Sequence, residues 1–426
     1  MLALAWLALG LAARAAPPPP SGTITYIVKR DETLLEIGHR ALEPVLAYRD
    51  VQRLNHIGND RRIPIGFPLI VPRAVLKTQP ILATVEGVHG AATLAGDGGA
   101  LAVGRTLGEG AVILTGANAF VRLGLPDDSH LAIPSNSRVR LDRLRLVVLT
   151  GGIEREIGVQ SGGLESQVTP MRDPSSRFVV VTPVAQSAVR GTEFRVSYDL
   201  FKGVAASSVF KGAVGVSNPR AEALARAGQG VVATRSGLAG PLTLLPPPVL
   251  APGAEVQGGE GLQFALTPVA GAERYRWVLA GDPKAEAPLF EQTSNQPLAH
   301  FPAVPDGDYY LRAAAISREG LEGEPSITQI TRLRGDLAIL GAAPGADGQI
   351  EFRWVSPGDA PPTYRFVLAR RDDRQHPVVD RDGLTEPRIA VPGLAPGDYA
   401  WTVFSMRTVN GRRLQIVSDP QPLHVP

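Results

Sequence analysis

Short apolar segments separated by turn-forming residues constrain the fold most, and the stretch from Phe178 to Val196 shows the pattern best. Phe178–Val181 is a β-branched apolar run, which is typical of a buried strand. Pro183 cannot donate to a sheet ladder, so it should end that strand or lie at an edge. Gly191 indicates a bulge or a positive φ. Phe194 and Val196 alternate with charged residues, as in a half-buried strand. The stretch therefore predicts two strands joined by a corner.

The same stretch resembles the signature of the FecR domain, the periplasmic module of iron-dicitrate sensor regulators. The resemblance implies a bacterial envelope protein from a non-catalytic family. Arg190 has two interpretations: its planar guanidinium ties loop carbonyls or a carboxylate in the corner, or it contacts a partner directly. The signature residues are Thr182, Pro183, Val189, Arg190, Gly191, Thr192 and Phe194.

Similar short strands with Gly or Asp-Ser turns surround this signature, for example at 119–123, 131–133 and 146–149. Their even spacing predicts a β-roll or β-helix-like FecR domain over 80–240, with a sandwich as the alternative. Classical members of the family begin with a cytoplasmic segment and one membrane helix. Neither pattern occurs here, so we do not expect the anti-sigma role to carry over.

Length and charge limit the possible classes. A chain of 426 residues is long enough for three or four domains. A net charge of +2 with interspersed signs argues against nucleic-acid binding. Cysteine is absent, which excludes disulfides, thiolate catalysis and cysteine-based metal sites. We therefore expect a multi-domain, mainly β protein.

The N-terminus carries a targeting pattern. Leu2–Leu11 is apolar, and Ala13-Arg14-Ala15 offers a small-x-small cleavage site. We expect a signal peptide at 1–15, a stiff Pro-rich spacer at 16–22, and a periplasmic mature protein without a membrane span. An uncleaved anchor is the alternative, although its apolar core is short of the roughly 20 residues that a span needs.

Residues 23–75 resemble a LysM domain, the peptidoglycan-binding module. Tyr26–Leu34, Leu54-Asn55 and Ile63–Pro72 match the ends and the apolar skeleton of that family. The resemblance implies a small βααβ unit that binds N-acetylglucosamine-containing glycan between two loops. The alternative is a degenerate module that docks on its neighbour. The implied glycan-binding residues are Asp31, Glu32, Thr33, Leu34, Asn59, Asp60, Arg61, Arg62 and Ile63.

The C-terminal part contains one pattern twice. Tyr275–Ala280 recurs as Tyr364–Ala369, and a Gly-Asp-Tyr near 309 recurs near 399. The offset of about 90 residues is that of an immunoglobulin-like β-sandwich, and both copies resemble fibronectin type III domains. We expect a Pro-rich linker at 241–253 and sandwiches at 254–335 and 336–426. We interpret Tyr309 and Tyr399 as packing anchors.

Catalytic and metal-binding patterns are missing from the sequence. It contains no His-Glu-x-x-His, no Gly-x-Ser-x-Gly and no P-loop. We therefore expect no enzyme activity, no cofactor and no metal. Two functions remain: a non-catalytic peptidoglycan-associated scaffold that also contacts envelope proteins, or a signalling component that acts with an outer-membrane receptor or sigma-factor system.

Overall fold

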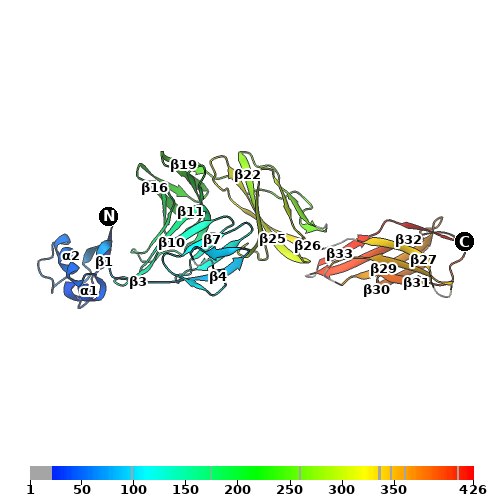
Figure 1. The fold of residues 1–426 in the computed structure, drawn as a ribbon, viewed down its shortest axis with the longest axis horizontal. Helices are drawn as coiled ribbons and strands as arrows, with labels where there is room; N and C mark the ends of the chain where they lie inside the picture. Colours follow the sequence, from blue (N-terminus) through cyan, green and yellow to red (C-terminus); the bar gives the residue numbers. More distant parts are fainter. Residues whose placement is uncertain are drawn as a thin grey trace, which may run out of the picture.

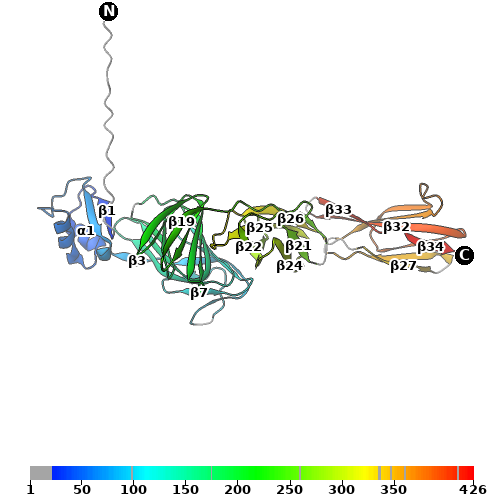
Figure 2. The ribbon, with the colours of Figure 1, turned by 90° about the horizontal axis from the view of Figure 1, so that it is seen from above.

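The computed structural model describes residues 22–96, 99–173, 175–258, 261–333, 337–345, 348–358, 361–409 and 412–426. Four units follow one another along the long axis, in chain order (Figures 1 and 2). The predicted signal peptide and all but the last residue of the predicted spacer lie outside the described residues. No helix in the described part is long and apolar enough to cross a membrane.

The N-terminal unit, residues 23–76, contains two helices beside a two-stranded antiparallel sheet. Thr33 caps the first helix, and its side chain and that of Glu36 form a reciprocal capping box. Leu34 and Ile37 turn inward onto Tyr26 and Leu69 in one apolar core. Its elements are β1 (Thr23–Ile27), α1 (Leu34–Ala41), the 3₁₀ turn η1 (Val45–Ala47), α2 (Tyr48–Leu54), β2 (Pro68–Pro72) and the 3₁₀ turn η2 (Arg73–Val75).

The middle domain, residues 78–243, is built from two facing layers that share one long strand. β11 (Ile153–Gln167) pairs with the first layer through its N-terminal part and with the second through its C-terminal part. The first layer contains β3 (Thr78–Pro80), β5 (Ala92–Leu94), β7 (Val112–Thr115), β10 (Arg138–Val147), β12 (Arg177–Val181), β13 (Gln186–Val189), β16 (Ala213–Asn218) and β17 (Ala221–Arg226). The second contains β4 (Ala83–His89), β6 (Thr106–Leu107), β8 (Phe120–Gly124), β9 (His130–Ile133), β14 (Glu193–Asp199), β15 (Val204–Lys211), β18 (Gln229–Thr234) and β19 (Gly237–Thr243).

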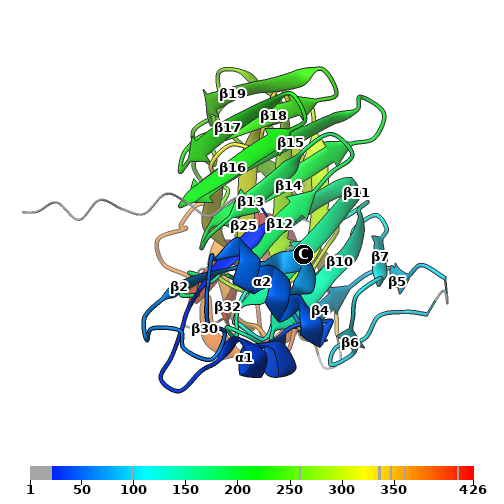
Figure 3. The same cartoon turned by 90° about the vertical axis from the view of Figure 1, so that its left-hand side faces the viewer.

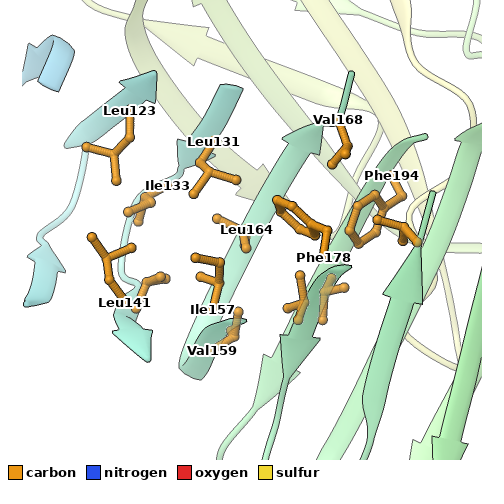
Figure 4. Close-up of a cluster of buried hydrophobic side chains, with 14 of the residues drawn as sticks. Leu123, Leu131, Ile133, Leu141, Ile157, Val159, Leu164, Val168, Phe178 and Phe194 are labelled. Carbon is orange, nitrogen blue, oxygen red and sulfur yellow. The ribbon is translucent and has the colours of Figure 1, made fainter. Parts of the chain in front are cut away.

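The core of this domain lies between the two layers, and Figure 4 shows part of it. Phe178 of β12 meets Phe194 of β14 edge to face, with ring centroids 6.2 Å apart. Leu164 and Ile157 of β11 lie in the same cluster. A β-helix would stack parallel strands, whereas β11–β12 is the one parallel pair that the structure describes in this domain. These pairings form two antiparallel layers, because hairpin turns reverse the chain, and they do not confirm the expected β-roll or β-helix-like stack.

Two sandwiches complete the chain. The first has a five-stranded sheet, β20-β26-β25-β22-β23, facing β21-β24, and the second has β27-β28-β31 facing β30-β29-β32-β33, with β34 also on β32. The first contains β20 (Val256–Gln257), β21 (Leu262–Ala265), β22 (Ala272–Ala280), β23 (Pro288–Ser294), β24 (Leu298–Phe301), β25 (Gly307–Ser317) and β26 (Ser326–Arg332). The second contains β27 (Ala338–Pro344), β28 (Ile350–Val355), β29 (Thr363–Arg370), β30 (Val379–Leu384), β31 (Arg388–Val391), β32 (Gly397–Val409), β33 (Arg412–Val417) and β34 (Gln421–Val425).

The repeated motif takes the same place in both sandwiches. The hydroxyl of Tyr309 donates to the carbonyl of Pro305 at 2.9 Å, and that of Tyr399 donates to the carbonyl of Ala395 at 2.8 Å. Both rings also pack against the apolar core of their own sandwich. Each tyrosine thus joins the start of a long strand to the loop before it, which agrees with their interpretation as packing anchors.

Candidate binding surfaces

The two loops implied in glycan binding meet at the start of α1. The backbone N–H of Leu34 donates to the carbonyl of Asp60 at 3.0 Å. The side chains of Leu34 and Ile63, however, lie in the apolar core of the unit. Only their backbone can face a ligand, because both side chains pack in this core. Asp31, Asn59, Arg61 and Arg62 are exposed.

Glu32 and Thr33 brace the first loop. The Glu32 carboxylate accepts hydrogen bonds from the Tyr26 hydroxyl at 2.8 Å, from the Lys29 N–H at 2.8 Å and from Arg40 at 2.6 Å. Partial burial raises the pKa of Glu32, but these three donors outweigh it and leave the pKa below its ordinary value. Thr33 caps α1. These two polar side chains hold the loop rather than reach outward.

The N-terminal unit docks on the middle domain through the other end of α1. Lys77 donates its N–H to the carbonyl of Ala41 at 2.8 Å. Val147 and Leu149 of the middle domain complete the apolar core of the unit, and Arg73 contacts Glu154 at 2.5 Å. Docking therefore leaves the two loops at the start of α1 open.

The signature residues form a corner between β12 and β14. Thr182 donates its N–H to the carbonyl of Ala185 at 2.9 Å, and its hydroxyl oxygen accepts the N–H of Ala185 at 3.1 Å. Gly191 has a φ of 82°, as its sequence position predicts. A Cβ at Gly191 would lie 2.7 Å from the Cα of Pro170. Both this contact and the positive φ disfavour any residue with a side chain at this position.

Arg190 does not brace this corner. Its side chain is exposed, and no hydrogen bond or ion pair joins it to the rest of the described chain. The bracing interpretation is therefore wrong, because hydrogen bonds within the turn at Thr182 and the glycine conformation at Gly191 already hold the corner. Direct contact of Arg190 with a partner stays a prediction.

An interface cluster of charged residues joins the middle domain to the first sandwich. Glu165 of β11 lies at its centre, with Arg195 at 2.6 Å, Arg276 at 2.5 Å and Arg312 at 3.1 Å. The two other carboxylates complete the set: Glu291 lies 2.5 Å from Arg276, and Glu322 lies 3.0 Å from Arg195. The interface cluster comprises Glu165, Arg195, Arg276, Glu291, Arg312 and Glu322.

The three carboxylates balance the three guanidinium groups in a mostly buried place. Side-chain exposure is 4% at Glu322, 7% at Arg276 and 24% at Glu165. Burial alone would raise the pKa of Glu165, but Arg312, Arg276 and Arg195 hold it well below its ordinary value. Burial lowers the pKa of Arg276, and Glu291, Glu165 and Glu322 reverse that effect. Both groups therefore stay charged at neutral pH.

Backbone and apolar contacts extend the same interface. Ser135 of the middle domain donates its N–H to Glu291 at 2.8 Å. Leu321 of the first sandwich packs with Ala206, Val232 and Leu244. Leu244 belongs to the predicted linker, and its neighbour Leu245 accepts the N–H of Glu324 at 2.9 Å. The segment lies fixed along the sandwich, so the two units form one continuous structure.

Comparison with known protein families identifies the family of one segment in the middle of the chain. Residues 111–215 match the family described as FecR protein. This segment is a FecR domain. The match lies inside the range 80–240 that the sequence predicts and contains the whole signature corner. No curated protein matches the chain.

Solved structures give weaker likenesses. A Parabacteroides distasonis protein described as an anti-sigma factor is 21% identical, with a TM-score of 0.26 over 30% of this chain and 57% of that one, so the chain spans little more than half of its length. A two-domain fibronectin type III segment of chicken tenascin is 16% identical, with a TM-score of 0.26 over 43% of this chain and 99% of that one. At such TM-scores neither likeness carries an argument.

The interface cluster was missed at the sequence level. Arg276 and Arg312 lie inside apolar strands, in Tyr-Arg-Trp-Val and Leu-Arg-Ala-Ala. A charged residue between buried neighbours on a strand faces away from the core. This pattern was the available sequence signal that the two arginines face another part of the chain. Their acidic partners come from β11, β23 and the turn after β25, so pairing needs the assembled domains. Within the described residues no group of His, Asp or Glu could hold a metal ion.

Proposed function

We propose that the chain is a non-catalytic signalling component of the cell envelope that acts through its FecR domain. The observation that carries this proposal is the family match over residues 111–215. The exposed signature residue Arg190 supports it, since a residue that the fold does not use is available to a partner. In this proposal the mature chain is periplasmic, and its partner belongs to an outer-membrane receptor or sigma-factor system.

The neighbouring units would hold the FecR domain in a fixed orientation. Arg73 and Glu154 connect it to the N-terminal unit, and the interface cluster connects it to the first sandwich. Domains with so many charged and apolar cross-contacts move together. A partner on the FecR domain would therefore meet one preset surface.

Deletion of the gene in the bacterium that makes the chain tests this proposal. We expect transcripts of a defined set of envelope genes to change, and the full-length chain supplied in trans to restore them. A chain with Gly191→Asp should not restore them, because the signature corner cannot form. An unchanged transcript profile in the deletion strain would contradict the signalling role.

A second candidate function is peptidoglycan binding by the N-terminal unit. It is favoured by the contact between Leu34 and Asp60, which brings the two implied loops together at the end that docking leaves open. A shallow sugar site binds weakly alone, and a polymer of adjacent sites offsets this weakness.

Sedimentation of the full chain with purified peptidoglycan tests this second function. Asn59→Ala with Arg62→Ala should lower retention, whereas Arg49→Ala with Arg53→Ala, on the exposed side of α2, should leave it unchanged. Full-length chain that stays in the supernatant would make the unit a docking module only.

A further inference from the structure

Three exposed arginines form a row on the outer face of the first layer of the middle domain. The β12–β13 register, with Phe178 opposite Val189, places Arg177 next to Arg190. The next pairings place Arg190 beside Ala213 and Ala213 opposite Arg226. We call Arg177, Arg190 and Arg226 the arginine row; Figure 3 shows the strands β12, β13, β16 and β17 that carry it.

The side chains of the arginine row have no hydrogen-bonding or ion-pair partner within the described residues. The acid nearest to it in register is Glu154, opposite Arg177. Its carboxylate is already occupied, by Arg73 at 2.5 Å and by Arg143 at 3.7 Å. Like charges on neighbouring strands destabilise a sheet. The fold thus gains nothing from the row, which indicates a use outside the chain.

A second row, of apolar and small residues, runs parallel to the arginines. Ala188 lies opposite Gly215, and Gly215 opposite Leu224. Val179, opposite Ala188, is 1% exposed and does not reach the surface. Ala188 is exposed, and Leu224 keeps 50% of its accessible surface. Small side chains let a ligand approach the sheet closely, and Leu224 offers apolar contact. Glu222, at the far end of β17, is the acid on this side of that strand.

We propose that this face docks an acidic segment of a partner protein, with carboxylates on the arginine row and apolar side chains on the row from Ala188 to Leu224. The inference rests on the proposed function and names the surface by which the FecR domain meets its partner. Guanidinium groups bind carboxylates in a bidentate manner. A purely anionic polymer or a lipid headgroup would leave the apolar row unused, so a peptide with both residue types fits better.

Fluorescence anisotropy with the full chain provides the test. The probes are labelled twelve-residue peptides of alternating Glu and Leu, of Glu and Ser, and of Lys and Leu, together with unlabelled polyphosphate and anionic vesicles as competitors. We expect Glu-Leu to bind best, and its affinity to fall as salt is raised. The variant Arg177→Gln, Arg190→Gln, Arg226→Gln should lose about tenfold in affinity, the sum of three partly exposed ion pairs.

The matched control is Arg371→Gln, Arg374→Gln, Arg381→Gln, which removes the same charge from exposed positions of the second sandwich. It should bind like the wild type. Equal binding by the arginine-row variant and the wild type would overturn the proposal, as would absent binding of Glu-Leu or displacement by polyphosphate or vesicles alone. If the gene deletion changes transcripts and the arginine-row variant restores them fully, the docking surface fails while the signalling function stands.

Discussion

Two groups of three arginines in this protein have opposite environments. Those of the interface cluster are mostly buried, and three carboxylates neutralise them. Those of the arginine row are exposed and have no described partner. The first group fixes the FecR domain to the first sandwich, and the second contributes nothing to the fold. The same residue type therefore has a structural role where acids surround it and an external role where they do not.

Removing a carboxylate charge from the interface cluster should have the largest effect, because it leaves arginines unpaired, as they are in the arginine row. Glu165→Gln removes the charge that three arginines share, and breaking a buried ion pair typically costs 3–5 kcal/mol. Since Glu165 keeps some exposure, we expect a loss of about 3 kcal/mol at the interface. Urea unfolding and hydrogen exchange at the Ser135 amide measure it.

Glu386→Gln is the matched control, since Glu386 also pairs with an arginine, but at an exposed position of the second sandwich. Exposed pairs contribute little, so this variant should unfold like the wild type. Equal effects of the two substitutions would remove the distinction between buried and exposed pairs.

Acid should weaken the interface in the same way. The pKa values of Glu165 and Glu291 are lowered in the folded chain, because buried arginines outweigh desolvation. Their stabilisation is complete above the ordinary glutamate pKa of 4.5 and is lost as pH falls through the lower folded values. The protection factor of the Ser135 amide, which corrects for the intrinsic pH dependence of exchange, should therefore fall below about pH 4.5. In Glu165→Gln this dependence should be shallower, and an identical profile would contradict the assignment.

Changing the corner without changing its charge gives an intermediate effect. Gly191→Ala meets Pro170 and forces a positive φ on alanine, so we expect a loss of about 2 kcal/mol. Gly203→Ala is the control, because its Cβ has open space at a similar φ. Thermal unfolding compares the two, and the difference isolates the clash from the backbone strain.

The strands and the signature corner could be predicted from sequence because their signals are local. Gly191 needed a positive φ, and Phe194 alternated with charged neighbours, so each position carried its own evidence. The β-roll or β-helix-like stack is not confirmed, because strand direction depends on which strands pair, and β11 pairs in both layers. The interface cluster was missed for the same reason: Glu165 meets Arg276 across 111 residues.

Arg190 is a residue whose predicted structural role is absent from the structure, and its substitution should have the smallest effect. Its place in the signature favoured a bracing role, which would cost about 2 kcal/mol to remove. The structure instead leaves its side chain exposed, beside Arg177 in the sheet register. Arg190→Ala should therefore change the free energy of unfolding by less than about 0.5 kcal/mol, and relief of like-charge repulsion favours stabilisation. Chemical unfolding measures this, with Arg371→Ala as an exposed control. A loss near 2 kcal/mol would restore the bracing role, and with it the distinction between the two groups of arginines would disappear.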